Sequence, residues 1–223
     1  MSQISLLTVD AAGTLLKPWP SVGAVYGRTA RNRGINVKDQ DLESQFSHAF
    51  IQAQKTSHSL KGNEKEFWRK VVELTFQPFT SESSNSSLFE ELWELFASGE
   101  PWRMADHAAN TLSTLKERGY RLAVLSNNDS RLRNVLKDLN IDHLFDHIFI
   151  SAEIGYEKPE VQLFRNVEAT LGVTSEKIMH LGDSYSRDYM GAKLVGWHPI
   201  LYGKPSGKEN HISSFTQLLD LLP

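Results

Sequence analysis

The amino-acid sequence predicts an α/β fold in which a doubly wound, Rossmann-like parallel sheet forms the core and a helical cap is inserted into it. Two observations carry this prediction. Short apolar runs alternate with amphipathic helical stretches in the second half of the chain, which is typical of a parallel sheet covered on both faces. Between the first and second apolar runs the pattern is helical throughout. The chain of 223 residues is 40% hydrophobic, enough to bury a full core.

The core sheet is expected to contain five strands. Each corresponds to a run that is continuously apolar rather than alternating, as strands buried on both faces are. The runs are residues 4–9 (ISLLTV), 121–126 (RLAVLS), 147–151 (HIFIS), 177–182 (KIMHLG) and 198–203 (HPILYG).

Helices are expected between the later strands, because their apolar residues recur at helical spacing and several end in a glycine suited to a left-handed cap. These helices are predicted over residues 106–119, 129–141, 160–172 and 186–196. Strands that alternate with helices in this way favour a doubly wound sheet.

Residues 17–100 are expected to form the inserted cap, and residues 1–16 and 101–223 the core. Helical patterns cover most of the insertion. Four helices are predicted there, at residues 22–34, 40–54, 64–76 and 87–99. The segment 80–87 (TSESSNSS) is the most loop-like part of the cap.

Composition narrows the classes of function. The net charge of -3 provides no basic field for nucleic acid, although a local pocket could still hold a small phosphorylated or otherwise anionic substrate. The chain has no cysteine, which removes disulfides, thiolate catalysis and cysteine-bound zinc. No stretch approaches the roughly 20 apolar residues of a membrane span, and no signal peptide is evident. We therefore expect a cytoplasmic protein that binds neither nucleic acid nor membrane, and we leave its oligomeric state open.

Polar residues stand at the carboxyl ends of three expected strands. Asp10 follows the first run, Ser126 ends the second, and Asp183 follows the run at 177–182. Ligands of open α/β sheets bind outside the carboxyl ends of the strands, where the strand order reverses. We expect these three segments to meet in one crevice.

The segments at 10–14 and 183–188 have the composition of a catalytic and metal site. Asp10 could act as a nucleophile, with Gly13 permitting a tight turn and the Thr14 hydroxyl orienting the carboxylate. Asp183 and Asp188 would add hard oxygen ligands, which Mg²⁺ prefers. Taken singly, each aspartate could equally start a turn or cap a helix.

Two further segments could bind an anion. In LSNND (125–129), Ser126 and Asn127 precede backbone amides that open the next helix. In GYEKPEVQLF (155–164), Lys158 lies just before a proline that begins a helix, where its charge could neutralise phosphate. A surface lysine and an ordinary turn are the alternatives.

Four segments of the chain resemble, in the same order, the four motifs of the haloacid dehalogenase-like hydrolase superfamily. These segments are TVDAAGTL, LSNND, GYEKPEVQLF and LGDSYSRD. The insertion after the first motif resembles the helical cap of that superfamily. The resemblance covers nearly the whole chain. The subgroup that it is most similar to is that of haloacid dehalogenase-like hydrolase domain-containing protein 3.

The resemblance implies a hydrolase with an aspartyl nucleophile, Asp10. Ser126 and Lys158 would hold the transferred group. Mg²⁺ would be bound by Asp10, the backbone carbonyl of Ala12 and Asp183. Asp188 would be a further ligand or would hold a metal-bound water.

The sequence departs from the family at Ala12, where family phosphatases carry the aspartate that protonates the leaving group. Four readings stay open. We favour a phosphoester or acyl-phosphate hydrolase acting without this acid. The alternatives are a pseudo-enzyme that binds a phosphorylated ligand or a protein, a phosphonatase with a cap lysine such as Lys55 or Lys61, and a dehalogenase. Dehalogenases of the family replace the Gly-Asp of the last motif, whereas Gly182 and Asp183 are present here.

Overall fold

The computed structural model describes residues 4–56, 64–80, 82–204, 207 and 210–223. The chain forms two compact units, one made of Met1–Lys17 with Met104–Pro223 and the other of Pro18–Arg103. We refer to them as the core unit and the helical unit, and describe each by itself.

The core unit is built on a six-stranded sheet in the order β5-β4-β1-β6-β7-β8, in which each strand is parallel to its neighbours. This confirms the predicted α/β fold with a doubly wound parallel sheet. The strands are β1 (Leu6–Val9), β4 (Arg121–Ser126), β5 (His147–Ile150), β6 (Ile178–Gly182), β7 (His198–Tyr202) and β8 (His211–Ile212). The edge strand β8 was not expected, because two residues are too short to give a periodic signal.

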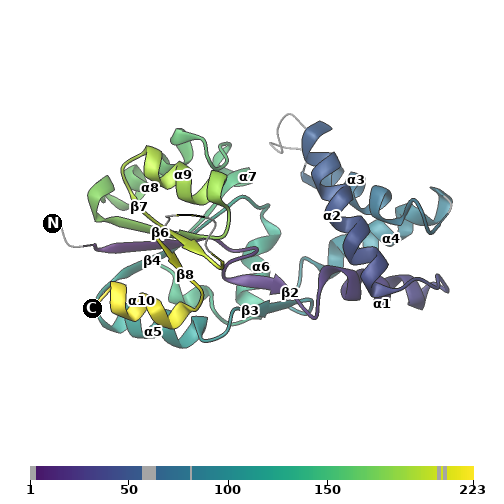
Figure 1. Ribbon diagram of the computed structural model, residues 1–223, viewed down its shortest axis with the longest axis horizontal. Coiled ribbons are helices and arrows are strands. Elements are labelled where there is room, and N and C mark those ends of the chain that lie inside the picture. Colours follow the sequence, from purple (N-terminus) through teal and green to yellow (C-terminus); the bar gives the residue numbers. More distant parts are fainter. Residues whose placement is uncertain (1–3, 57–63, 81, 205–206, 208–209) are drawn as a thin grey trace. The chain divides into compact units, whose positions relative to one another are not determined.

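Helices lie on both faces of this sheet (Figure 1). On one face, α8 and α9 bury Leu163, Phe164 and Ala192 against β1, β4 and β6. On the other lie α5 and α10. The helices of the core unit are α5 (Ala108–Glu117), α6 (Arg131–Asp138), α7 (Ser151–Ile154), α8 (Val161–Leu171), α9 (Met190–Leu194) and α10 (Leu218–Leu221).

The helical unit contains α1 (Val22–Asn32), α2 (Asp39–Thr56), α3 (Glu64–Phe76) and α4 (Glu82–Leu95). Its aromatic core includes Tyr26 stacked on Phe76, with ring centroids 5.7 Å apart.

We expected residues 80–87 to form a loop. This prediction is wrong from residue 82 onward, because α4 begins there. Buried Leu88, Phe89 and Leu92 anchor this helix, and extending it through polar residues costs only tenths of a kcal/mol each, roughly.

Both connections between the units run through a small two-stranded sheet of β2 (Leu16–Pro18) and β3 (Trp102–Met104). The Trp19 amide donates to the Pro101 carbonyl and the Ala105 amide to the Leu15 carbonyl, both at 2.8 Å. The residue numbers of these pairs run in opposite directions, so the strands are antiparallel. The sequence pattern did not predict this ribbon.

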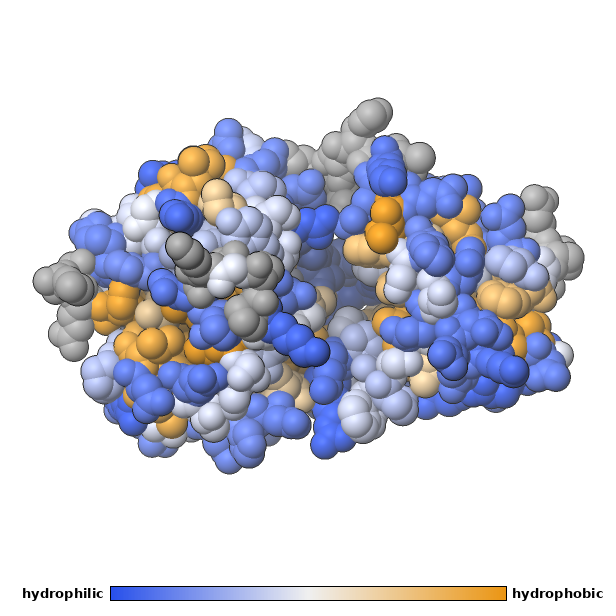
Figure 2. All heavy atoms as spheres, viewed as in Figure 1, coloured by the Kyte–Doolittle hydropathy of each residue, from blue (hydrophilic) through white to orange (hydrophobic). Residues whose placement is uncertain are grey.

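The described helices include none that is both long and apolar enough to span a bilayer. Figure 2 shows one face of each unit, where apolar residues form separate groups among hydrophilic ones.

Candidate active site

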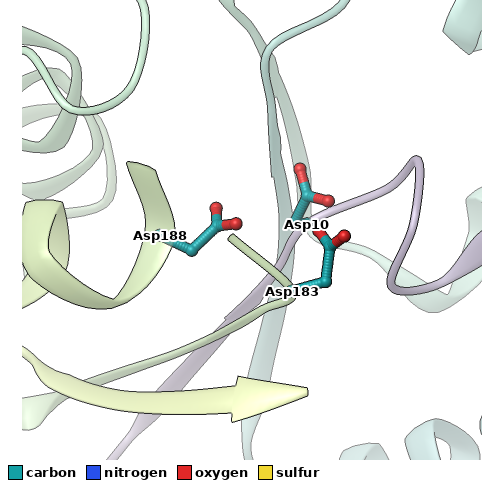
Figure 3. A group of neighbouring side chains, drawn as sticks. All are labelled: Asp10, Asp183 and Asp188. Carbon is teal, nitrogen blue, oxygen red and sulfur yellow. The ribbon is translucent and has the colours of Figure 1, made fainter. Parts of the chain in front are cut away.

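Strands β4, β1 and β6 are neighbours, so their carboxyl ends bring together residues that are far apart in the sequence. Asp10 directly follows β1, Ser126 ends β4, and Asp183 directly follows β6. The chain runs from β1 to β4 and β5 on one side and later to β6 on the other, which makes this edge the switch point of the sheet. Figure 3 shows Asp10, Asp183 and Asp188 converging there.

The turn after β1 fixes Asp10 and Thr14. The Asp10 amide donates to the Leu181 carbonyl of β6 at 2.8 Å. The Thr14 hydroxyl lies 3.3 Å from Oδ2 of Asp10 and 3.4 Å from Oδ1 of Asp183, so it can orient either carboxylate. Gly13 has a φ of 98°, and a Cβ there would collide with the Asp183 carboxylate. Only glycine satisfies both constraints.

Lys158 is buried at the centre of the site, with 3% of its surface exposed. Its Nζ donates to Oδ1 of Asp10 at 2.6 Å, to Oδ1 of Asp188 at 2.5 Å and to the Leu125 carbonyl at 2.9 Å. An ammonium has three hydrogens, and all three are used. The alternative of a solvated surface lysine is therefore wrong.

Asn127 holds the backbone of Lys158. Its Oδ1 accepts from the Lys158 amide at 2.7 Å and its Nδ2 donates to the Lys158 carbonyl at 3.0 Å. We expected Asn127 to bind substrate. In the structure both polar atoms of its side chain bond to the segment that carries Lys158, and substrate binding stays a prediction.

Asp188 lies within a π-helical turn, Tyr185–Tyr189, that follows β6. Its Oδ2 accepts from the Ser184 amide at 2.9 Å, and its Oδ1 is shared by Lys158 and by Nε2 of His180, 3.1 Å away. Each oxygen of Asp188 thus already has a donor within the protein. His180 was not expected in the site, and its signal in the sequence is an imidazole within an otherwise apolar run.

Burial and charge shift the pKa values of these groups in opposite directions. Burial raises the pKa of Asp10 to about 6, against the attraction of Lys158. Burial alone would also raise the pKa of Asp188, but Lys158 and the hydrogen bond from His180 hold it below its usual value. Burial disfavours the charged form of Lys158, yet Asp10 and Asp188 overcome this and raise its pKa. Lys158 therefore remains an ammonium ion, paired most firmly with Asp188.

The three carboxylates fit a divalent cation. Asp10, Asp183 and Asp188 each place an oxygen within 4.8 Å of the others, and a single ammonium leaves this group with excess negative charge. Asp183 is the exposed member, and partial desolvation together with Asp188 raises its pKa. Hard oxygen donors around uncompensated charge are what Mg²⁺ requires. Asp183 offers the most accessible oxygens, whereas Asp10 and Asp188 are buried and both accept from Lys158.

Two further residues that we expected in the site, Ser126 and Ala12, lie at the same edge of the core sheet. The Ser126 side chain is buried at the end of β4, and Ala12 is exposed in the turn after Asp10. Lys55 belongs to α2 in the helical unit, and Lys61 lies outside the described residues.

Gly182→Ala should destabilise the protein by about 1–3 kcal/mol, the usual cost of forcing an extra carbon into a packed site. A Cβ at residue 182 would overlap the carboxylate carbon of Asp188. Urea denaturation would measure the loss, with Ala123→Gly in β4 as a cavity-forming comparison. A variant as stable as the parent would mean that Asp188 can relax away from this position.

Comparison with known proteins places the chain in a family. The family model of haloacid dehalogenase-like hydrolases matches residues 4–196. Haloacid dehalogenase-like hydrolase domain-containing protein 3 of Bos taurus is 32% identical over 212 residues, which cover 91% of this chain and 83% of that protein. The expected resemblance to that subgroup is confirmed. A glyceraldehyde 3-phosphate phosphatase of Methanothermobacter thermautotrophicus is 34% identical over 96 residues, 43% of this chain and 42% of that protein.

The fold has close structural counterparts as well. The HAD-hydrolase YfnB of Bacillus subtilis, crystallised with magnesium, superimposes with a TM-score of 0.82 at 19% identity, covering 99% of both chains. Together with the family model and the order of the four motifs, this fold shows that the chain belongs to the haloacid dehalogenase-like hydrolases.

Proposed function

We propose that the protein is a Mg²⁺-dependent hydrolase of phosphoesters or acyl phosphates, with Asp10 as the nucleophile. The observation that carries this proposal is the position of Asp10, whose carboxylate lies between a buried ammonium and a second, exposed carboxylate at the switch point of the sheet. A carboxylate held in this way can attack phosphorus and form an acyl phosphate that water then cleaves.

Each residue of the site would have a distinct task. Lys158 holds Oδ1 of Asp10, which leaves Oδ2 to attack, and it supplies positive charge as negative charge develops on the transferred group. Thr14 orients the Asp10 carboxylate. The buried Ser126 hydroxyl, at the end of the neighbouring strand, would donate to an oxygen of the transferred group. Asn127 keeps the Lys158 segment in place.

Asp10 and Asp183, together with the Ala12 carbonyl, would hold Mg²⁺, with Asp188 binding at most through a water. When bound, the ion would neutralise the charge of the phosphate and of the carboxylates that face it. The magnesium of the YfnB crystal belongs to that protein, and its presence there is consistent with this assignment.

Ala12 limits the substrates. Alanine cannot protonate a leaving alcohol, and general acid catalysis contributes roughly 10²- to 10⁴-fold. Groups that leave without a proton, such as the carboxylate of an acyl phosphate or an activated aryl oxide, are therefore the preferred substrates. The chain's relative that is named a phosphatase supports phosphoryl chemistry in this family.

The absence of an acid at residue 12 also favours a second candidate function, a protein that binds a phosphorylated ligand without turning it over. The same anion and cation sites would serve binding.

Assays of phosphate release separate the candidates. They use alkyl, aryl and acyl phosphates and phosphonates as substrates, each with Mg²⁺ and with chelator. Halide release from haloacids is measured alongside. Chelator-sensitive phosphate release, fastest on acyl phosphates, is expected. Binding of phosphate compounds without release would overturn the hydrolase assignment.

Ala12→Asp should speed hydrolysis of alkyl phosphates by about tenfold or more, towards the roughly 10²- to 10⁴-fold that general acid catalysis contributes. Ala12 is exposed in the turn, so a larger side chain has room. Ala12→Asn is the matched control, since it has the same shape without the acid. An equal response of the two variants would contradict the idea that a proton donor is what the site lacks.

A further inference from the structure

The interior of the core sheet contains a buried polar pair that none of the proposed catalytic roles uses. Thr8 in β1 and His180 in β6 both have 0% of their surface exposed, and they are register partners on adjacent strands. Their neighbours along both strands are apolar. Burying two polar side chains in a sheet core costs free energy unless their hydrogen bonds are satisfied.

Hydrogen bonding satisfies both residues and selects one form of the imidazole. Nδ1 of His180 lies 2.8 Å from the Thr8 hydroxyl, and Nε2 lies 3.1 Å from Oδ1 of Asp188. A carboxylate only accepts, so Nε2 must carry a hydrogen. The Thr8 hydroxyl is nearer to Nδ1 than to the Met179 carbonyl, which is 3.3 Å away. Donation from Thr8 to Nδ1, the nearer of its two acceptors, would fix the tautomer that is protonated at Nε2.

Packing fixes the orientation of the same ring. Phe164 and Trp197 surround His180, with ring centroids 6.2 Å and 6.3 Å away and near-perpendicular planes. Trp197 is itself held by a 2.8 Å hydrogen bond from Nε1 to Glu168. These rings, together with the complete burial of His180, restrict rotation of the imidazole and keep solvent away from it.

We propose that His180 is a positioning residue, which Thr8 holds in the Nε2-protonated form so that it fixes Asp188 and thereby Lys158 against Asp10. The line of contacts runs from Thr8 through His180, Asp188 and Lys158 to Asp10, with steps of 2.8, 3.1, 2.5 and 2.6 Å. Its effect on rate rests on the proposed function, whereas its effect on the geometry of Lys158 does not.

The tautomer can be tested without any activity. Spectra of the ¹⁵N-labelled imidazole should show a protonated Nε2 and a bare Nδ1 for His180 in the intact protein. A hydrogen on Nδ1 would overturn the proposal, because Thr8 would then not be the donor.

The link to Lys158 can be tested by amine acetylation, with modification at each lysine measured by mass spectrometry. His180→Leu should raise the labelling rate of Lys158 several-fold relative to that of exposed Lys193. His180→Gln, whose amide nitrogen is the same number of bonds from Cα as Nε2, should restore much of the protection. Thr8→Val, nearly the same in shape, should have a smaller effect in the same direction. Thr111→Val, which removes a buried hydroxyl from α5, should have none.

Labelling of Lys158 that is unchanged in both His180→Leu and Thr8→Val would overturn the proposal. If a substrate is found, His180→Leu should lower kcat by roughly 10- to 100-fold, the usual cost of losing a group that orients a site ligand, with little change in KM. A lack of hydrolysis in the parent protein would count against the proposed function alone, since the imidazole and labelling measurements need no turnover.

Discussion

Asp10→Asn should abolish phosphate release while the protein stays folded. An amide is too weak a nucleophile to form the acyl phosphate, so turnover should fall to the background of the assay on every substrate that the parent cleaves. The fold should survive, because Asn keeps the shape of the side chain and removes one of three clustered carboxylates that burial already penalises. Phosphate release and circular dichroism on the same preparation would measure both effects.

The control for this variant is Asp138→Asn, which makes the same chemical change on the exposed end of α6. It should leave turnover unchanged. Sustained phosphate release by Asp10→Asn would show that another group attacks phosphorus. Loss of the fold would instead mean that the Asp10 to Lys158 pair is needed for stability.

Lys158→Met should be the most destabilising single change in the site, at about 3–5 kcal/mol, the usual cost of removing one partner of a buried ion pair. The variant leaves Asp10 and Asp188 buried without their cation. The penalty should shrink as the pH falls towards the pKa of Asp10, because a protonated carboxyl no longer needs a counterion. Urea denaturation at pH 7.5 and near pH 5 would measure both predictions.

Lys193→Met, on the exposed surface of α9, is the matched control and should change stability by less than about 0.5 kcal/mol. A Lys158→Met variant that is as stable as this control would indicate that water or a bound cation replaces the ammonium. Repeating the measurement with Mg²⁺ and with chelator would separate those two cases.

The sequence predicted the core fold and the edge of the sheet where the site lies, since both follow from local patterns. Each core strand except β8 is a continuous apolar run, and Asp10 and Asp183 come directly after two of these runs. In a parallel sheet that position alone sends the residues to one edge. The motifs therefore predicted that Asp10 and Asp183 would come together, even before the strand order was known.

Contacts between distant residues could not be predicted in the same way. Nothing in the segment around Lys158 indicates that its side chain is buried between Asp10 and Asp188, because that depends on how three segments pack. The partnership of Asn127 with the Lys158 backbone has no sequence signal either. Thr8 and His180 do have a signal in the sequence, because they are polar residues inside apolar runs, but such residues have many ordinary explanations.

The sequence pattern missed the start of α4, because Ser-rich segments resemble loops when the anchoring apolar residues come later in the helix.

The antiparallel ribbon of β2 and β3 makes the helical unit a separable module. The chain leaves the core unit through β2 and returns through its hydrogen-bonded neighbour β3. The two positions at which the helical unit could be removed are therefore adjacent. A tight turn could join these strands as in an ordinary hairpin, leaving every strand of the core sheet with its existing neighbours. Helical inserts from other proteins could be grafted onto the same stem without changing Asp10, Lys158 or Asp183, all of which belong to the core unit.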